Sequence, residues 1–135
     1  DILHDAGKAI NSAIERGQIE GGFVQGAGWL TMEEVKWKTN GQITTHSPST
    51  YKIPAVSDMP EKFNVEIFKD GKNKENVVNK SKTTGEPPLM NAMSVFFAIK
   101  DAISSVGNYD ITPIIDAPAT PEKILMSINN LKAKL

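Results

Sequence analysis

Two consecutive prolines, Pro87 and Pro88, restrict the folding of this chain more than any other feature. Proline fixes φ and cannot donate a backbone hydrogen bond, so it suits the first turn of a helix. Apolar residues then recur at intervals of three and four, the spacing of an amphipathic helix with one buried face: Leu89, Ala92, Met93, Phe96, Ile99 and Ile103. The sequence therefore predicts a helix that begins at Pro87.

Glu86 lies directly before this predicted helix, between Gly85 and the first proline. Because its neighbours leave the backbone little freedom, we expect its carboxylate to be held in place. The positive end of a helix favours a carboxylate, whereas apolar surroundings favour the neutral acid. A carboxyl group under both influences is a candidate general base. The alternative is an acidic residue that only stabilises the helix start, and this pattern by itself favours that alternative.

A glycine-rich segment over residues 17–30 predicts a second helix, because four apolar residues fall on one helical face: Ile19, Phe23, Ala27 and Leu30. A glycine inside a helix costs about 1 kcal/mol relative to alanine. This segment carries glycines at positions 21, 22, 26 and 28. Their presence indicates that another backbone or a ligand approaches the helix closely. Packing against a second helix is the interpretation that the spacing itself favours.

Shorter patterns complete the predicted architecture. Residues 1–5 and 63–67 alternate between polar and apolar types, as strands do. Asn40-Gly41 stands between two alternating runs, which predicts a β-hairpin over residues 35–45. Thr120 and Pro121 predict the start of a last helix. We therefore expect one α+β domain over residues 1–135, with a mixed or antiparallel sheet that contains the hairpin, a Gly-rich helix and two C-terminal helices.

Composition excludes several classes of function. The net charge of −1 offers no electrostatic basis for binding nucleic acid or an anionic membrane. Cysteine is absent, so the chain contains no disulfide and no thiolate ligand for zinc or an iron–sulfur cluster. His4 and His46 have no partner at metal-ligand spacing, so we expect surface or turn residues and no metal ligand. No apolar run is long enough to cross a membrane, and we expect a cytoplasmic protein.

Several stretches of the chain resemble the molybdenum-binding large subunit of the xanthine dehydrogenases and, more broadly, the molybdenum hydroxylases. They are Gly17-Gln18 with Glu20-Gly21 and Gln25-Gly26, Pro48 to Pro54, Ser81-Lys82 with Gly85 to Leu89, Ser94 to Ala102, and Asp116 to Glu122. The chain departs from the family at Ser12, where members commonly carry proline before the glycine-rich helix. Proline helps a helix start but is replaceable, so we expect only a local effect on stability.

The resemblance implies roles for two residues. Glu86 corresponds to the catalytic base beside the molybdenum, where it would activate a molybdenum-bound hydroxyl. Gln18 corresponds to a residue that contacts the pyranopterin, and a side-chain amide suits a pterin edge because it both donates and accepts hydrogen bonds. The metal is held by the dithiolene sulfurs of molybdopterin, so the family needs no protein ligand to molybdenum.

The resemblance implies that the chain is part of an enzyme that oxidises hypoxanthine or xanthine with oxygen derived from water. Because the chain opens on Asp1 without a methionine, we expect a fragment of a longer protein. The run from Asp116 to Glu122 resembles the C-terminal end of the family, so the resemblance implies the C-terminal piece of a molybdenum-cofactor-binding domain. Residues outside this chain would complete the molybdopterin site, and FAD and 2Fe-2S clusters would lie on other domains or subunits. A homo-oligomer is expected, and the isolated piece should be inactive.

Two alternatives to this function remain at the level of sequence. An aldehyde oxidase-type molybdenum hydroxylase shares the Gly-Glu motif at Gly85 and Glu86. The isolated fragment could instead be a catalytically inactive α+β domain that self-associates through exposed surface. Neither composition nor motif spacing identifies the substrate.

Overall fold

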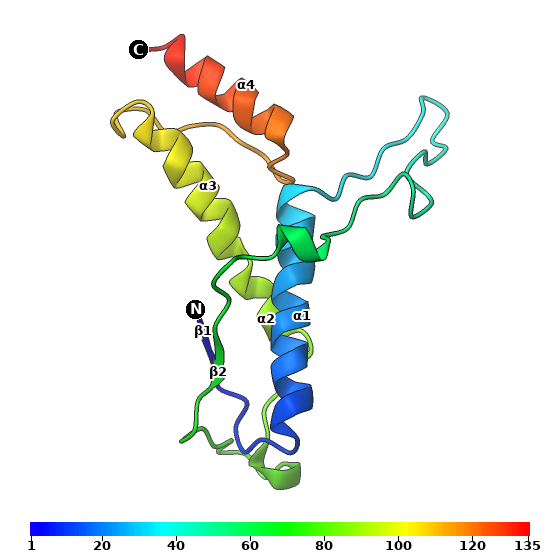
Figure 1. Cartoon of the computed structure of the whole chain (residues 1–135), viewed down its shortest axis with the longest axis vertical. Helices are drawn as coiled ribbons and strands as arrows, with labels where there is room; N and C mark the ends of the chain where they lie inside the picture. The colour runs from blue at the N-terminus through cyan, green and yellow to red at the C-terminus, as the bar shows by residue number, and fades with distance from the viewer. The chain divides into compact units, whose positions relative to one another are not determined.

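The computed structural model describes all residues from Asp1 to Leu135. The chain divides into two compact units, the first made of residues 1–26 and 55–92 and the second of residues 27–54 and 93–135. Helix α1 (Ser12–Thr31) contributes to both units (Figure 1). The organisation of residues 1–135 as a single domain stays a prediction.

The first unit combines two short strands with helical segments. Besides the first part of α1, it contains β1 (Ile2–His4), the 3₁₀ turn η1 (Val56–Asp58), β2 (Val65–Ile67), the 3₁₀ turn η2 (Val78–Lys80) and the short helix α2 (Pro87–Asn91). Both predicted strands are therefore present, at residues 2–4 and 65–67. The α+β class is confirmed.

The sheet in this unit is parallel, so the expected mixed or antiparallel sheet is wrong. β1 pairs with β2 in the register Ile2 with Val65 and His4 with Ile67. Antiparallel neighbours can be joined by a tight turn, but a parallel pair needs a long crossover connection. Here the chain from Asp5 to Asn64, which includes α1, separates the two strands in sequence. Local patterns could not reveal a pairing between segments so far apart.

The glycine-rich helix forms as predicted and is capped by Asn11. The side-chain oxygen of Asn11 accepts hydrogen bonds from the backbone N–H groups of Ala13 and Ile14, each at 3.2 Å. Ile19 is fully buried, and the ring of Phe23 lies 5.2 Å from that of Phe63, the distance between ring centroids. Ile19 and Phe23, two of the four residues of the predicted apolar face, therefore lie in the core of the first unit.

The predicted β-hairpin over residues 35–45 is wrong, although the chain reverses direction where the sequence indicates. Gly41 has φ +83°, and its N–H donates to the carbonyl of Lys38 at 2.9 Å. A single isolated antiparallel bridge joins Trp37, before the reversal, to Ile43, after it, and no strand is present there. Both apolar side chains are exposed, so this reversal has no packed face to stabilise a ladder.

The second unit contains the end of α1 and two further helices, α3 (Met93–Ser105) and α4 (Pro121–Lys132). The N–H of Ala119 donates to the carbonyl of Leu30 at 2.7 Å and so ties the segment before α4 to α1. Ile103 and Leu131 are buried, and Gly107 lies against the Leu131 side chain. Figure 1 shows that the loop after α3 returns toward the end of α1 before α4 begins. The two predicted C-terminal helices are thus confirmed.

Two details of these helices differ from the sequence pattern. The helix predicted from Pro87 onward is interrupted at Ala92, whose N–H bonds to Leu89 O, three residues back, at 3.1 Å. This shorter hydrogen bond ends α2 before α3 begins. At the start of α4, Thr120 accepts from the N–H of Lys123, as predicted for an N-cap.

Candidate functional site

Glu86 occupies the N-cap position of α2, at the end of an irregular segment that leads from η2. Its φ and ψ are −101° and −42°, and its carbonyl accepts from the N–H of Leu89 at 3.1 Å. Pro87 is the first helical residue, as the double proline predicts. The Glu86 side chain is exposed and makes no capping hydrogen bond. An acidic N-cap normally accepts hydrogen bonds from the first helical N–H groups. Because the Glu86 carboxylate does not, it is available to another group.

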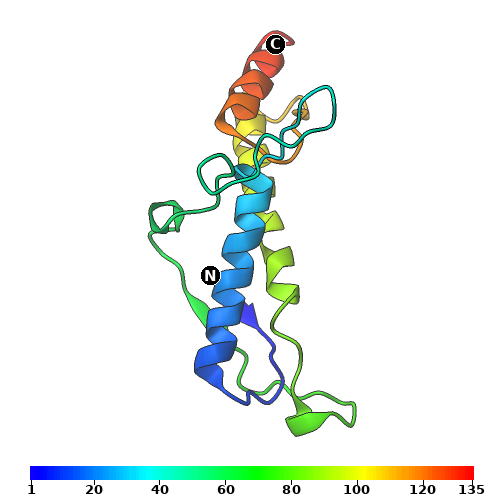
Figure 2. The same ribbon diagram turned by 90° about the vertical axis from the view of Figure 1, so that its right-hand side faces the viewer.

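Two glycines of α1 form the surface on which α2 rests, and α2 lies beside α1 in both views (Figures 1 and 2). A Cβ atom placed on Gly22 would lie 3.0 Å from Cβ of Pro88. A Cβ on Gly26 would lie 2.5 Å from the carbonyl oxygen of Leu89. At these two positions, the glycines therefore allow close packing of a second helix, which is the interpretation that their spacing favoured.

Two other glycines of α1 have a different environment. Nothing lies within 4 Å of a Cβ placed on Gly17 or Gly21. Gln18 and Gln25 lie within a turn of them on the same side of the helix, and both are exposed. Helix packing within this chain does not explain Gly17 and Gly21. They leave helical backbone uncovered beside two side-chain amides.

Gln18 lies next to the loop that carries Glu86. A Cβ placed on Gly85 would lie 4.0 Å from Oε1 of Gln18, so the loop passes close to this oxygen. The Gln18 amide has no hydrogen-bond partner in the chain. The structure thus brings together the two stretches that the sequence singled out, residues 17–26 and 83–90. The catalytic and cofactor-binding roles of Glu86 and Gln18 stay predictions.

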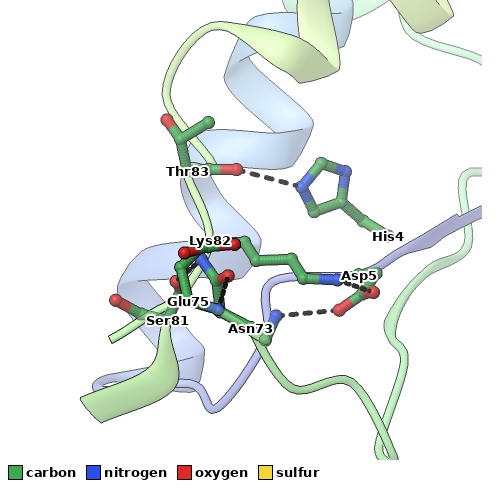
Figure 3. Close-up of polar contacts among 8 residues, drawn as sticks. His4, Asp5, Asn73, Glu75, Ser81, Lys82 and Thr83 are labelled. Atoms are coloured by element: carbon green, nitrogen blue, oxygen red, sulfur yellow. Dashed lines mark hydrogen bonds and ion pairs between the residues drawn. The ribbon is translucent and has the colours of Figure 1, made fainter. Parts of the chain in front are cut away.

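The segment Lys80–Thr83, here called the strap, precedes the Glu86 loop and is held by polar contacts that sequence reasoning missed. Lys82 Nζ forms an ion pair with Oδ2 of Asp5, and Figure 3 shows the lysine side chain extending to that carboxylate. The hydrogen bond from Lys82, together with one from the Gly7 N–H, lowers the pKa of Asp5 below its usual value.

The sequence gives little indication of these strap contacts. Lys82 stands inside the stretch Ser81-Lys82 that resembles the family, yet nothing in the sequence identifies Asp5, 77 residues away, as its partner. His4 is half-buried, and its Nε2 lies 3.4 Å from the carbonyl oxygen of Thr83. Since a carbonyl can only accept, His4 must be the donor.

The side chains of the chain form no cluster of three or more histidine, aspartate or glutamate residues that could hold a metal ion. None of the helices has the length and apolar content that a membrane crossing requires.

Comparisons with known proteins find similarity over almost the whole chain. Residues 1–60 match the molybdopterin cofactor-binding domain. The chain is 46% identical to the xanthine dehydrogenase of Oryza sativa subsp. japonica over 94% of its own length, and 48% identical to the xanthine dehydrogenase/oxidase of Mus musculus over 92%. The chain belongs to the molybdenum hydroxylase family. It spans only about 10% of the length of these curated relatives.

Solved structures of two larger proteins contain the same fold. Quinoline 2-oxidoreductase from Pseudomonas putida 86 superposes with a TM-score of 0.78 at 31% identity, over 94% of this chain and 15% of that one. A Cu,Mo-CO dehydrogenase superposes with a TM-score of 0.79 at 20% identity, over 98% of this chain and 16% of that one. The latter likeness concerns the fold alone.

The residues of this molybdenum hydroxylase segment fit the edge of a pterin. The amide of Gln18 offers both a donor and an acceptor, is exposed, and has no partner within the chain. Gly17 and Gly21 leave uncovered space next to it. A flat polar ring can approach a helix surface of this kind without displacing a side chain.

Proposed function

We propose that this chain is part of a xanthine dehydrogenase-like molybdenum hydroxylase that oxidises hypoxanthine or xanthine. The observation that carries this proposal is the position of the Glu86 loop, which is packed onto the glycines of α1 beside the free amide of Gln18. The identity of 46–48% to xanthine dehydrogenases over almost the whole chain supports the choice of substrate class.

Glu86 is the general base of the proposed reaction. Hydroxylation with oxygen from water breaks a C–H bond, forms a C–O bond, and releases two electrons and two protons. A bound molybdenum–pterin group supplies the site that receives the electrons. Glu86 accepts a proton from the oxygen nucleophile, which a carboxylate within hydrogen-bond reach can do. Because its carboxylate has no capping hydrogen bond, no bond of that kind has to break first.

The remaining parts of the chain position these two groups. Pro88 packs on Gly22 and so fixes the start of α2, immediately after Glu86. Gln18 sits on the rigid backbone of α1 and would bind the pterin edge through its amide. Both residues thus lie on well-supported elements, although their own side chains remain exposed.

The complete enzyme would contain more than this chain supplies. The chain would be the C-terminal piece of a molybdenum-cofactor-binding domain, since the run from Asp116 to Glu122 resembles the C-terminal end of the family and the chain spans only about 10% of its relatives. Other segments would complete the cofactor and purine sites. FAD and 2Fe-2S clusters on further domains or subunits would carry the electrons away, and the enzyme would be a homo-oligomer.

Glu86→Gln in the full-length protein tests the base assignment. Glutamine keeps the size of the side chain but accepts no proton, and loss of a general base costs about 10²- to 10⁴-fold in rate. We expect kcat for xanthine to fall by that factor while the molybdenum content is unchanged. Glu122→Gln is the matched control, because Glu122 is likewise an exposed glutamate at the start of a helix. A Glu86→Gln protein with full molybdenum and normal turnover would remove Glu86 from the mechanism.

Substrate choice is tested separately, because quinoline 2-oxidoreductase is 31% identical to this chain. Turnover of hypoxanthine, quinoline and an aldehyde by the full-length protein should differ strongly and favour hypoxanthine. Preference for the aldehyde would support the aldehyde oxidase-type alternative and contradict the purine proposal.

A further inference from the structure

The strap, Lys80–Thr83, is paired along its length with the residues that follow β1. The N–H of Lys82 donates to the carbonyl of Ala6 at 2.8 Å, and the N–H of Lys8 donates to the carbonyl of Lys80 at 3.1 Å. An antiparallel bridge joins Gly7 and Ser81 between these two bonds. The backbone of the strap is therefore fixed to the N-terminal part of the chain.

Side chains add a second set of contacts to the strap (Figure 3). Asp5 accepts from Lys82 through Oδ2 and from the Gly7 N–H through Oδ1, the latter at 2.9 Å. The amide nitrogen of Asn73 donates to the carbonyl of Ser81 at 3.0 Å, and His4 Nε2 donates to that of Thr83 at 3.4 Å. Asp5 thus links the end of β1, its own turn and the strap.

The strap ends three residues before Glu86. Thr83 is the last residue that these contacts hold, and the next anchored side chain is that of Pro88, buried against Gly22. Glu86 therefore lies on a short span between two fixed points. A shift of the strap moves the start of this span, and with it the carboxylate.

We propose that the ion pair between Asp5 and Lys82 is a positioning device for Glu86. It acts through the strap, and neither residue touches the reacting atoms. This inference rests on the proposed role of Glu86 as the general base. A misplacement of about 1 Å at a reacting group can cost about 10²-fold in rate, so fixing the strap has a catalytic consequence.

The exposure of the ion pair separates this role from a purely structural one. About 40% of the Asp5 side chain and 36% of the Lys82 side chain remain accessible. Ion pairs with this much solvent contact contribute little to the free energy of unfolding. Removing the pair should therefore leave the fold and cofactor content intact while the position of Glu86 loosens.

The test uses Lys82→Met and Asp5→Asn in the full-length, molybdenum-loaded protein. We expect each variant to lower kcat for xanthine by about 10- to 10²-fold, with KM and molybdenum content unchanged, because the lost contact matters only for the reacting geometry. Lys82→Arg retains a cation opposite Asp5 and should restore most of the rate. Lys36→Met removes a comparable exposed ion pair, with Glu34, and should leave the rate normal.

A double variant tests whether the ion pair acts through the general base. Lys82→Met added to Glu86→Gln should cause no further loss of rate, because Glu86 is then already absent. A normal kcat in both single variants would overturn the inference. So would a loss of rate that accompanies loss of molybdenum or of thermal stability. If Glu86→Gln itself turns over normally, the proposed function fails. If that variant is inactive and Lys82→Met is normal, only the positioning role fails.

Discussion

Tyr51 and Glu33 form a side-chain hydrogen bond within the second unit. The Tyr51 hydroxyl donates to Oε2 of Glu33 at 2.6 Å and ties the loop between Pro48 and Pro54 to the residues after α1. The hydrogen bond to this carboxylate raises the pKa of Tyr51, and burial and the negative charge of Glu33 raise it further. Nothing in the sequence identified Glu33 as the partner of Tyr51.

This bond predicts a pH dependence of stability. The pKa of Tyr51 is raised above its unfolded value of 10.0, so the stabilisation is fully present below pH 10 and is lost as pH rises through the folded pKa. Tyr51→Phe should lower the free energy of unfolding at neutral pH, and the deficit should shrink in alkaline solution. Urea unfolding across that range measures it. Tyr109→Phe is the control, because the Tyr109 hydroxyl also faces a carboxylate, that of Asp101, but at 3.5 Å, where a hydrogen bond is weak. A deficit that stays constant at high pH would contradict the assignment.

At the level of elements, the packing of α2 on α1 depends on glycine at position 26. A Cβ there would lie 2.5 Å from the Leu89 carbonyl oxygen and 2.7 Å from Cβ of Ala92, and neither a backbone atom nor a buried alanine moves easily. Gly21 has open space in the same helix. The two positions therefore separate the packing role of glycine from its general cost in a helix.

Gly26→Ala should destabilise the chain, whereas Gly21→Ala should not. Overpacking at a close contact costs about 1–3 kcal/mol. Gly21→Ala should gain about 1 kcal/mol of helix propensity, because the new methyl group meets no other atom. Chemical denaturation of the two variants beside the unmodified chain measures the difference. Equal stability of the two variants would show that α2 does not rest on Gly26 as the structure has it.

Elements that are specified by neighbouring residues could be predicted from the sequence. The double proline gives the start of α2, and Thr120 with Pro121 gives the start of α4. The Asn40-Gly41 reversal was also predictable, but the strands around it were not. A reversal is decided by local backbone preference, whereas strands need a surface to pack on, and Trp37 and Ile43 have none.

At the scale of the whole molecule, the features that sequence analysis missed join distant segments. Strand β2 pairs with a strand 63 residues earlier in register, and Lys82 pairs with Asp5 across 77 residues. No local periodicity encodes such partners. Glu86 and Gln18 were identified through the resemblance to the family, because the spacing alone favoured a helix cap and helix packing. The structure adds that their two segments meet at Gly85.

The exposed apolar surface leads to a prediction for the isolated chain. Large apolar side chains are exposed in both units, among them Leu3, Ile14, Trp37, Ile53, Val56, Val78 and Ile114. Surfaces of this kind mark interaction sites or cause aggregation, and the chain spans only about 10% of its relatives. We therefore expect the isolated chain to self-associate as its concentration rises and to carry no molybdenum.

Light scattering over a dilution series, together with metal analysis, measures both properties. The average mass should fall toward that of one chain on dilution, since apolar association follows mass action. The full-length protein is the control, because there the other segments should cover this surface and its mass should not vary. An isolated chain that stays monomeric at every concentration and carries stoichiometric molybdenum would contradict the prediction. That result would mean that residues 1–135 form the cofactor site without help from other segments.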